Sequence, residues 1–433
     1  MSLRLLLVSF SFSRGGAATA ARKFAKLALS FADVSCFCAE PSSVDDELPV
    51  DSPSRSQFCI HYIKRMVSYF LLKLMRDGNP AKHSLNLFSA RNVLHGIKGA
   101  ECSSTVLHLH WINNDTLSIW RLRKLPPGTV ITLHDEWLYC GSEHYYPTDA
   151  KDCKFVDGYL CSEPGVRGLN WNRWIWKIKL LQLRSRDDLI FTVPSKWMLD
   201  RAIQSIILKD KDVRLLPNPI EMDQFKPFGQ IERTVLRAKI GFSESDIVFT
   251  IGAVKGAQNP LKGFAIFKAA LTLLRQQLDD ALLVRIQLVM FGCGKPKTHQ
   301  YCGFPVVNFG RINSTADMKK AYGVADCTVV PSLVESFGQI SAESLACQTP
   351  VVAFRNSGIM DIVQHESNGY LAEPYYAESL ANCLKRMINL TRLERASMGR
   401  LGREHVEENF SLPVVSGIYQ NIITEALKTK RFY

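Results

Sequence analysis

Long apolar runs are missing from this sequence, because no segment approaches the roughly 20 apolar residues that a membrane-spanning helix needs. Residues 5–12 could pass for a very short secretory segment, but a buried strand entering a loop at Gly15 and Gly16 explains them better. Three of the 12 scattered cysteines, Cys327, Cys347 and Cys383, lie within apolar segments, where thiols act as small hydrophobes. Nothing demands an oxidising compartment, so we expect a cytoplasmic protein.

Two families of recognition motif are also absent. A dinucleotide-binding loop needs the spacing G-x-G-x-x-G and an acidic residue about 20 positions later, and the chain has neither in place. Zinc-finger spacings and RNA-recognition signatures are missing as well. These absences argue against a dinucleotide-dependent oxidoreductase and against a nucleic-acid partner.

The composition that is present suits two domains with separate cores. The chain has 433 residues, of which 46% are hydrophobic and 22% are charged. A net charge of +12 attracts acidic partners: nucleic acid, anionic lipid or phosphorylated substrates. Without a nucleic-acid motif, the charge favours a membrane surface or a phosphate-bearing ligand.

The most informative stretch reads P-S-L-V-E-S-F-G-Q-I-S-A-E-S-L-A-C-Q-T-P, residues 331–350. It follows a short apolar run and predicts a strand, a loop and then a helix whose mouth is Phe337, Gly338 and Gln339. A helix amino terminus offers N–H groups to an anion. Glu335 in the loop and Glu343 in the helix can hold hydroxyl groups, so the pattern suits a ligand with both phosphates and sugar diols.

This stretch resembles the donor-sugar motif of glycosyltransferase family 4, retaining enzymes with the GT-B fold. The resemblance implies that Glu335 contacts the donor sugar and Glu343 the ribose of a UDP- or GDP-linked donor. The resemblance to this family covers nearly the whole chain, but its specific motifs lie mainly between Lys262 and Gly369. The resemblance also implies a metal-independent reaction without a further cofactor. The one Asp-x-Asp segment, Asp210-Lys211-Asp212, is therefore expected to lie on the surface.

Cations are expected opposite the leaving diphosphate. Lys262, in the segment N-P-L-K-G-F, matches the lysine that meets the phosphates in the family. Family members also carry an arginine straight after the preceding strand, where this chain has Ala253, and Lys255 is the nearest cation. Gly16, in the first loop, is a further candidate for a backbone contact to the donor.

Two histidines stand where strands end in the first half of the chain. His110 closes the segment T-V-L-H-L-H, and His134 follows T-V-I-T-L. Ligands approach the carboxyl ends of strands in open α/β sheets. H-L-H-W and T-L-H-D-x-W resemble relatives that build bacterial surface polysaccharides, which implies that His134 is catalytic and reaches toward the donor sugar and acceptor.

Three cysteines and a histidine follow at Cys140, His144, Cys153 and Cys161. They could hold a structural metal, but their spacing matches no standard zinc motif, and Glu143 stands where similar relatives place a cysteine. A loop with free thiols is the alternative.

Two helices rich in basic and aromatic residues are expected at residues 59–76 and 169–186. Each could lie on an anionic membrane, and the second would present Lys177, Lys179 and Arg184 beside its tryptophans. The first could equally pack on a sheet with its charges in water, and for the second, packing of its tryptophans in a core is the favoured alternative. Both interpretations stay open from the sequence, and with them peripheral association with the inner face of the plasma membrane.

The expected fold class is α/β: GT-B, with two Rossmann-like, doubly wound parallel sheets facing a central cleft. We expect an acceptor-binding domain at residues 1–218, a nucleotide-sugar domain at 219–410 and a crossing helix at 411–433. No hairpin is expected, and residues 406–427 read as one helix. Gln348 and Ser357 replace family glycines, and Gln348 should need a positive φ.

The resemblance implies transfer of a sugar to a hydroxyl of a saccharide acceptor, foremost a polyprenyl-diphosphate-linked oligosaccharide in bacterial surface polysaccharide biosynthesis. A nucleotide-sugar epimerase with the same fold and an inactive, basic membrane scaffold are the rival interpretations. The sequence does not identify the donor base, the sugar, the linkage or the acceptor.

Overall fold

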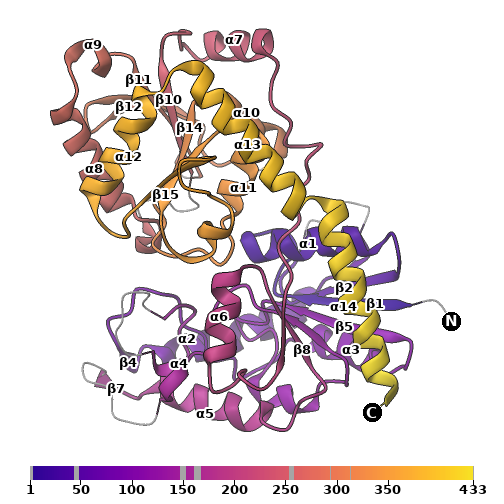
Figure 1. The fold of residues 1–433 in the computed structure, drawn as a ribbon. Coiled ribbons are helices and arrows are strands. Elements are labelled where there is room, and N and C mark those ends of the chain that lie inside the picture. Colours follow the sequence, from indigo (N-terminus) through magenta and orange to yellow (C-terminus); the bar gives the residue numbers. More distant parts are fainter. Residues whose placement is uncertain are drawn as a thin grey trace. The chain divides into compact units, whose positions relative to one another are not determined.

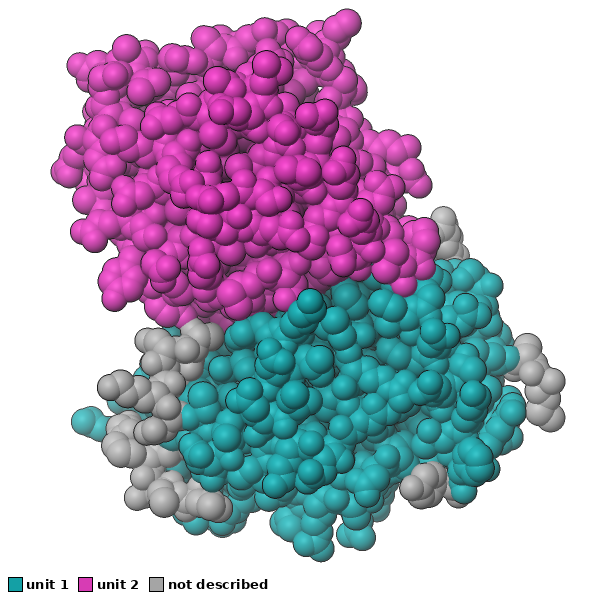
Figure 2. Space-filling view, viewed as in Figure 1, with its two compact units in different colours: residues 1–219, 415–433 teal, residues 220–414 magenta. Residues whose placement is uncertain are grey.

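The structure is a computed structural model that describes residues 3–42, 48–146, 153–159, 167–252, 258–292, 294–312 and 314–432. The chain forms two compact units, residues 1–219 with 415–433 and residues 220–414 (Figure 2). The first boundary falls one residue after the position expected from the sequence. Each unit is built around one seven-stranded sheet.

The sheet of unit 1 is parallel throughout its described strands, in the order β3-β2-β1-β5-β6-β8-β9. Alternate residues of β1 point to opposite faces, so that Leu5 and Leu7 join one core and Leu6 and Val8 join another. The strands are β1 (Arg4–Ser9), β2 (Asp33–Cys38), β3 (Val50–Asp51), β5 (Thr105–His110), β6 (Val130–Thr132), β8 (Ile190–Val193) and β9 (Asp212–Leu215).

Helices cover both faces of this sheet, as in a doubly wound fold (Figure 1). The helix α1 (Gly16–Ala28) packs Phe24 and its alanines on one face, and α3 (Arg91–Gly99), α5 (Trp171–Leu183) and α6 (Lys196–Gln204) cover the other. Smaller elements complete the unit: α2 (Arg55–Leu72), α4 (Lys154–Asp157), η1 (Ile119–Lys124) and the antiparallel pair β4 (Met75–Arg76) and β7 (Arg167–Gly168).

The end of the chain is not the single helix expected over residues 406–427. The structure has α13 (Arg392–Phe410) and α14 (Leu412–Phe432), separated by Ser411 in an extended conformation. Pro413 falls in the first turn of α14, where a missing N–H costs nothing. From Val415 onward the chain belongs to unit 1, and Tyr419, Ile422 and Ile423 pack with α1 in its core.

Unit 2 has the strand order β12-β13-β11-β10-β14-β15-β16. Its sheet corrects the expectation that the chain has no hairpin, because β12 pairs antiparallel with β13 through a turn at Cys302 and Gly303. The strands are β10 (Ile247–Gly252), β11 (Ile286–Phe291), β12 (Lys297–Tyr301), β13 (Phe304–Asn308), β14 (Cys327–Val330), β15 (Val351–Phe354) and β16 (Gly369–Ala372). The polar sequence K-T-H-Q-Y of β12 suits an exposed edge strand, which carries little hydrophobic signal.

Helices also cover both faces of the second sheet. One face carries α8 (Phe264–Gln277) and α12 (Ala377–Asn389), and the other carries α10 (Thr315–Gly323), α11 (Gln339–Ala346) and α13. The remaining elements are α7 (Gln230–Lys239), α9 (Asp280–Leu283), η3 (Pro260–Lys262) and η4 (Ser357–Asp361). None of the helices in the described part of the chain is both long and apolar enough to cross a membrane.

Gln348 and Ser357 both adopt left-handed backbone conformations. Gln348 follows α11 with φ 60°, as the sequence predicted, and Ser357 has φ 51°. Such conformations strain a residue with a side chain, at a cost of about 1–2 kcal/mol. The chain therefore tolerates strain immediately beside its most motif-rich segment.

The helix α5 distinguishes between the two interpretations of residues 169–186. Lys179 is fully buried: its ammonium donates to the carbonyls of Trp137 and Gly141 and lies over the Trp137 ring. Burial lowers the pKa of Lys179 to about 7. Trp176 is buried too, whereas Trp174 is exposed. The core interpretation therefore holds for Trp176 and Lys179.

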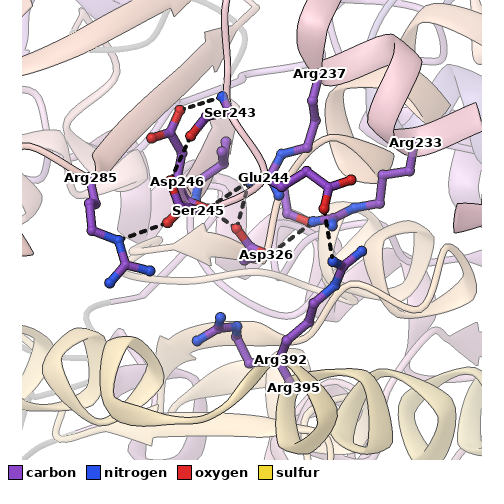
Figure 3. A network of polar contacts seen from close by, with 12 residues as sticks. Arg233, Arg237, Ser243, Glu244, Ser245, Asp246, Arg285, Asp326, Arg392 and Arg395 are labelled. Atoms are coloured by element: carbon purple, nitrogen blue, oxygen red, sulfur yellow. Dashed lines mark hydrogen bonds and ion pairs between the residues drawn. The ribbon is translucent and has the colours of Figure 1, made fainter. Parts of the chain in front are cut away.

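A buried ion cluster ties α7 to the sheet of unit 2. In Figure 3, Arg233 and Arg237 of α7 both reach Asp326, with N–O distances of 2.9 and 2.8 Å, and the Val248 N–H donates to the same carboxylate. Burial alone would raise the pKa of Asp326, but Arg237 and Arg233 hold it below its usual value. A buried pair that is cut on one side leaves an uncompensated charge, so this cluster should be sensitive to mutation.

We predict that Asp326→Asn lowers the free energy of unfolding at pH 7 by about 3 kcal/mol or more. The depressed pKa means that the contribution is complete above about pH 4 and is lost as pH falls through the folded-state pKa. Urea titrations at neutral and acidic pH would measure it. Asp317→Asn, which breaks an exposed pair with Lys320, is the matched control and should cost less than about 1 kcal/mol.

Candidate functional site

The candidate site in unit 2 lies where two neighbouring parallel strands, β10 and β14, end. Lys262 belongs to η3, which follows β10, and Glu335 lies in the loop that joins β14 to α11. Because parallel strands present their carboxyl ends at one edge of the sheet, both side chains emerge at the same edge. The sequence predicted both residues as site residues, and the fold brings them together.

Lys262 and Glu335 form an ion pair, with Nζ and Oε1 2.5 Å apart and both side chains partly exposed to solvent. The backbone enforces this contact. Leu333 N–H donates to the carbonyl of Leu261 over 2.8 Å, and Gly263, at φ 64°, lies against the carbonyl of Pro331. A Cβ on Gly263 would fall 1.8 Å from that oxygen, so glycine is required there. The pair is therefore set by the close approach of two loops.

A second loop holds the backbone of Glu335. The Glu335 N–H donates to the hydroxyl of Ser357 over 2.9 Å, and Gly358 N–H donates to the Glu335 carbonyl over 2.9 Å. Asn356 donates through its side chain to the carbonyl of Leu333. The strained Ser357 thus has a definite contact, because its hydroxyl fills the hydrogen bond that a glycine would leave open.

Glu343 lies in the second turn of α11 and is buried. Its Oε2 accepts from Tyr322, at 3.0 Å, and its Oε1 accepts from Gln339, at 2.7 Å. Burial and the neighbouring Glu343 raise the pKa of Tyr322 well above its usual value, so this phenol stays a donor. Two predicted site residues, Gln339 and Glu343, are thereby joined.

The mouth of α11 is built from backbone. Gly338 precedes the helix at φ 103°, and the side chain of Phe337 points into the core against Phe410. Of Phe337, only the backbone can therefore face a ligand. Lys255 and Ala253 lie outside the described residues, so the second predicted cation stays a prediction.

In unit 1, Gly16 opens α1 directly after Gly15, which has φ 93°. A Cβ at either glycine would meet nothing within 4 Å, so the loop is open to an approaching ligand. The first turn of α1 carries no acidic residue, which leaves its positive dipole end uncancelled.

His134 does not stand alone at the end of β6. Its Nε2 lies 3.0 Å from Nδ1 of His110, and the rings stack with centroids 5.3 Å apart. His108 lies beside His110 and bonds to Tyr419 of α14 and to Thr132. Burial lowers the pKa of His134 to about 4 and that of His108 to about 3. At neutral pH His134 is a neutral imidazole, which can donate one hydrogen bond and accept another.

His144, one of the predicted metal candidates, belongs to a different network. Its Nδ1 lies 2.6 Å from Asp135, its Nε2 lies 2.8 Å from the Ser84 hydroxyl, and the indole of Trp111 donates to Asp135. Among the described residues no three His, Cys, Asp or Glu side chains gather to hold a metal. Cys161 falls outside those residues, and Cys140 and Cys153 carry free thiols.

Sequence reasoning missed Asp135 and Ser84 as partners in this network. The pattern H-D-x-W at residues 134–137 was a usable signal, because an acid directly after a strand-end histidine lies at the same sheet edge. Ser84 had no local signal, since it is 60 residues from His144 in the sequence.

Comparison with known proteins finds a family model that matches one segment of the chain. Residues 233–405 match the family model described as Glycosyl transferases group 1, and this segment lies within unit 2. Mannosylfructose-phosphate synthase from Agrobacterium fabrum is 25% identical over 257 residues, which are 57% of this chain and 54% of that protein. The chain spans about half the length of the curated relatives it matches.

Solved structures resemble the whole chain. Sucrose-phosphate synthase from Thermosynechococcus elongatus has a TM-score of 0.67 at 17% identity, covering 98% of this chain and 99% of that one. Anabaena HepE, solved in complex with UDP and glucose, has a TM-score of 0.65 at 15% identity, covering 98% and 99%. At these identities the likeness shows the fold alone, and it confirms the GT-B fold predicted from the sequence.

The lowered pKa of His134 predicts a stability loss on mild acidification. With a folded-state pKa of about 4 against about 6.5 when unfolded, His134 takes up its proton first in the unfolded chain. Stability therefore falls as pH drops from about 6.5 to about 4, and His134→Gln should flatten that slope by up to about 1.4 kcal/mol per pH unit. Urea titrations across this range would measure the slope.

His95→Gln, at an exposed position of α3, is the matched control and should leave the slope as in the wild type. Equal slopes in the wild type and His134→Gln would contradict the low pKa of His134.

Proposed function

We propose that this protein is a retaining glycosyltransferase, because residues 233–405 match the glycosyl transferases group 1 model and the chain has a GT-B fold. Its donor is a nucleotide sugar, and its acceptor is a hydroxyl of a saccharide. The ion pair of Lys262 and Glu335 beside the mouth of α11 is the observation that carries the proposal.

In this proposal the cationic groups bind the diphosphate and the two glutamates bind hydroxyl groups. Breaking the donor's sugar–phosphate bond leaves a nucleoside diphosphate, and Lys262 with the backbone mouth of α11 supplies positive charge to it. Glu335, anchored through its backbone by Ser357 and Gly358, accepts hydrogen bonds from the donor sugar. Glu343 receives the ribose hydroxyls, for which Gln339 would give up its bond to Oε1. Transfer on one face of the sugar requires no covalent nucleophile.

Unit 1 supplies the acceptor side in this proposal. His134 is neutral at physiological pH, so it binds a sugar hydroxyl through hydrogen bonds. Gly16 offers the open amino terminus of α1 to the donor phosphates. HepE was solved with UDP and glucose, which supports a UDP-linked donor over a GDP-linked one.

The acceptor is a lipid-diphosphate-linked oligosaccharide of bacterial surface polysaccharide synthesis, reached from the cytoplasmic face of the membrane. The chain's charge of +12 supports an acidic acceptor. A small phosphorylated sugar is the second candidate acceptor, because the relative from Agrobacterium fabrum is a mannosylfructose-phosphate synthase. A nucleotide-sugar epimerase would instead release free sugar, and an inactive scaffold would need neither Lys262 nor Glu335.

We predict that Glu335→Ala abolishes transfer while the protein stays folded. Lys262→Met should lower kcat/KM by about 10²–10³-fold, as expected when a charge-stabilising donor is removed. Release of nucleoside diphosphate, measured with each donor, would test both variants. Lys268→Met removes an equal charge from an exposed position of α8 and should transfer normally. Normal turnover in Glu335→Ala would refute the site.

Donor binding can be tested apart from transfer. Thermal unfolding with UDP, GDP or ADP should show a higher midpoint with one nucleotide, by mass action. We expect the shift with UDP, and its loss in Lys262→Met. No shift with any of the three nucleotides would favour the inactive scaffold.

A further inference from the structure

The helix α2 carries its apolar residues on the outside. Ile60, Ile63, Val67, Phe70 and, just past its end, Leu74 recur at intervals of three and four residues, which places them in one stripe. Their side chains are 43% to 63% exposed. Tyr62 and Tyr69 flank the stripe and are exposed as well. A surface helix normally turns such a stripe to the core.

The inner face of α2 is polar over most of its length, and Leu71 and Leu72 at its end pack partly buried against the core of unit 1. The buried positions of the helix are His61 and Ser68. The guanidinium of Arg65 lies 4.8 Å from the ring centroid of Phe10, in the loop after β1, and is attracted by Glu40 and Asp115. The inner face thus covers polar groups at the carboxyl edge of the unit 1 sheet. These contacts, together with the packing of Leu71 and Leu72, hold α2 in place, and its apolar stripe is left without a role in the core.

The charge of the segment is of one sign. From Arg55 to Arg76 the sequence contains no aspartate or glutamate, and its cations are Arg55, Lys64, Arg65, Lys73 and Arg76. The ammonium of Lys73 lies 4.6 Å from the ring centroid of Tyr69, directly beside the stripe. A second copy of this helix would bring like charges together, whereas an anionic surface would complement them.

We propose that α2 docks this protein on an anionic lipid bilayer. The stripe from Ile60 to Leu74 enters the interface between headgroups and acyl chains, and Lys64, Lys73 and Arg76 meet lipid phosphates. The polar inner face stays over the sheet edge, on the side where a saccharide acceptor would bind. This deepens the acceptor side of the proposed function and rests on it, but lipid binding can be measured without any transfer.

The helix α5 does not offer the same surface. It buries Trp176 and Lys179, and the ammonium of Lys179 donates hydrogen bonds to two backbone carbonyls. Of the two basic, aromatic helices, only α2 therefore combines an outward apolar stripe with cations on its border.

Flotation of the full chain with vesicles tests the proposal. We expect binding to phosphatidylcholine vesicles that contain phosphatidylglycerol, weaker binding to phosphatidylcholine alone, and weakening by salt. The double variant Ile63→Ser/Phe70→Ser should bind at least about tenfold less, because two apolar side chains no longer leave water. Lys73→Gln/Arg76→Gln should lose about fivefold per charge, on anionic vesicles only.

Ile231→Ser/Leu393→Ser is the matched control, since both residues are 82% exposed but lie on α7 and α13. It should float as the wild type does, and thermal unfolding should show that all variants are folded. Absence of wild-type binding, or equal binding by the α2 variant, would overturn the proposal. A wild-type dimer that dissociates only in the α2 variant, without vesicle binding, would assign the stripe to a second copy.

The two proposals fail separately. If vesicle binding is absent but UDP still raises the unfolding midpoint, docking is wrong and the donor site stands. If vesicle binding is present but no nucleotide shifts the midpoint, the docking helix stands and the enzymatic function is wrong.

Discussion

The approach of Gly263 to the carbonyl of Pro331 is the contact on which the candidate site depends. It brings the segment after β10 against the loop after β14, and it leaves no space for a side chain at residue 263. With Leu333 bonded to Leu261, the two loops act as one support for Lys262 and Glu335. A cation and a carboxylate are thereby preorganised at a helix mouth, and the proposed donor site relies on this arrangement.

The strain beside this site has a local compensation. Ser357 adopts φ 51°, where a side chain is unfavourable, yet its hydroxyl accepts the N–H of Glu335. Gly358 donates to the carbonyl of the same residue, so both backbone groups of Glu335 are fixed. Backbone strain of this kind persists where surrounding contacts determine the conformation. The loop at 356–358 is therefore part of the support of the site, although it contributes no side chain to the ion pair.

In unit 1 most of the clustered polar side chains are buried, and His134 is partly exposed. His108, His110 and His134 form a neutral cluster, and His144 and Ser84 form a second cluster around Asp135, whose pKa the neighbouring His144 holds below its usual value despite burial. In unit 2 the charged cluster is that of Asp326, where two arginines share one carboxylate (Figure 3). In each case partners satisfy most of the buried polar atoms, although His110 Nε2 and Arg237 Nε have no partner among the described residues. The cost of losing one partner is correspondingly high.

By itself, the sequence determined the alternation of strands and helices, the β14–α11 motif with its two glutamates, and the positive φ of Gln348. These follow from residue patterns within about 20 positions, which local propensity and spacing can express. Only the tertiary structure decided which face of a helix is buried. Lys179 and Trp176 went inside, and the apolar stripe of α2 stayed outside. The hairpin β12–β13 was also invisible, because an edge strand buries too little to show a pattern. Burial is a property of neighbours that are distant in the chain, and a single stretch of sequence does not contain them.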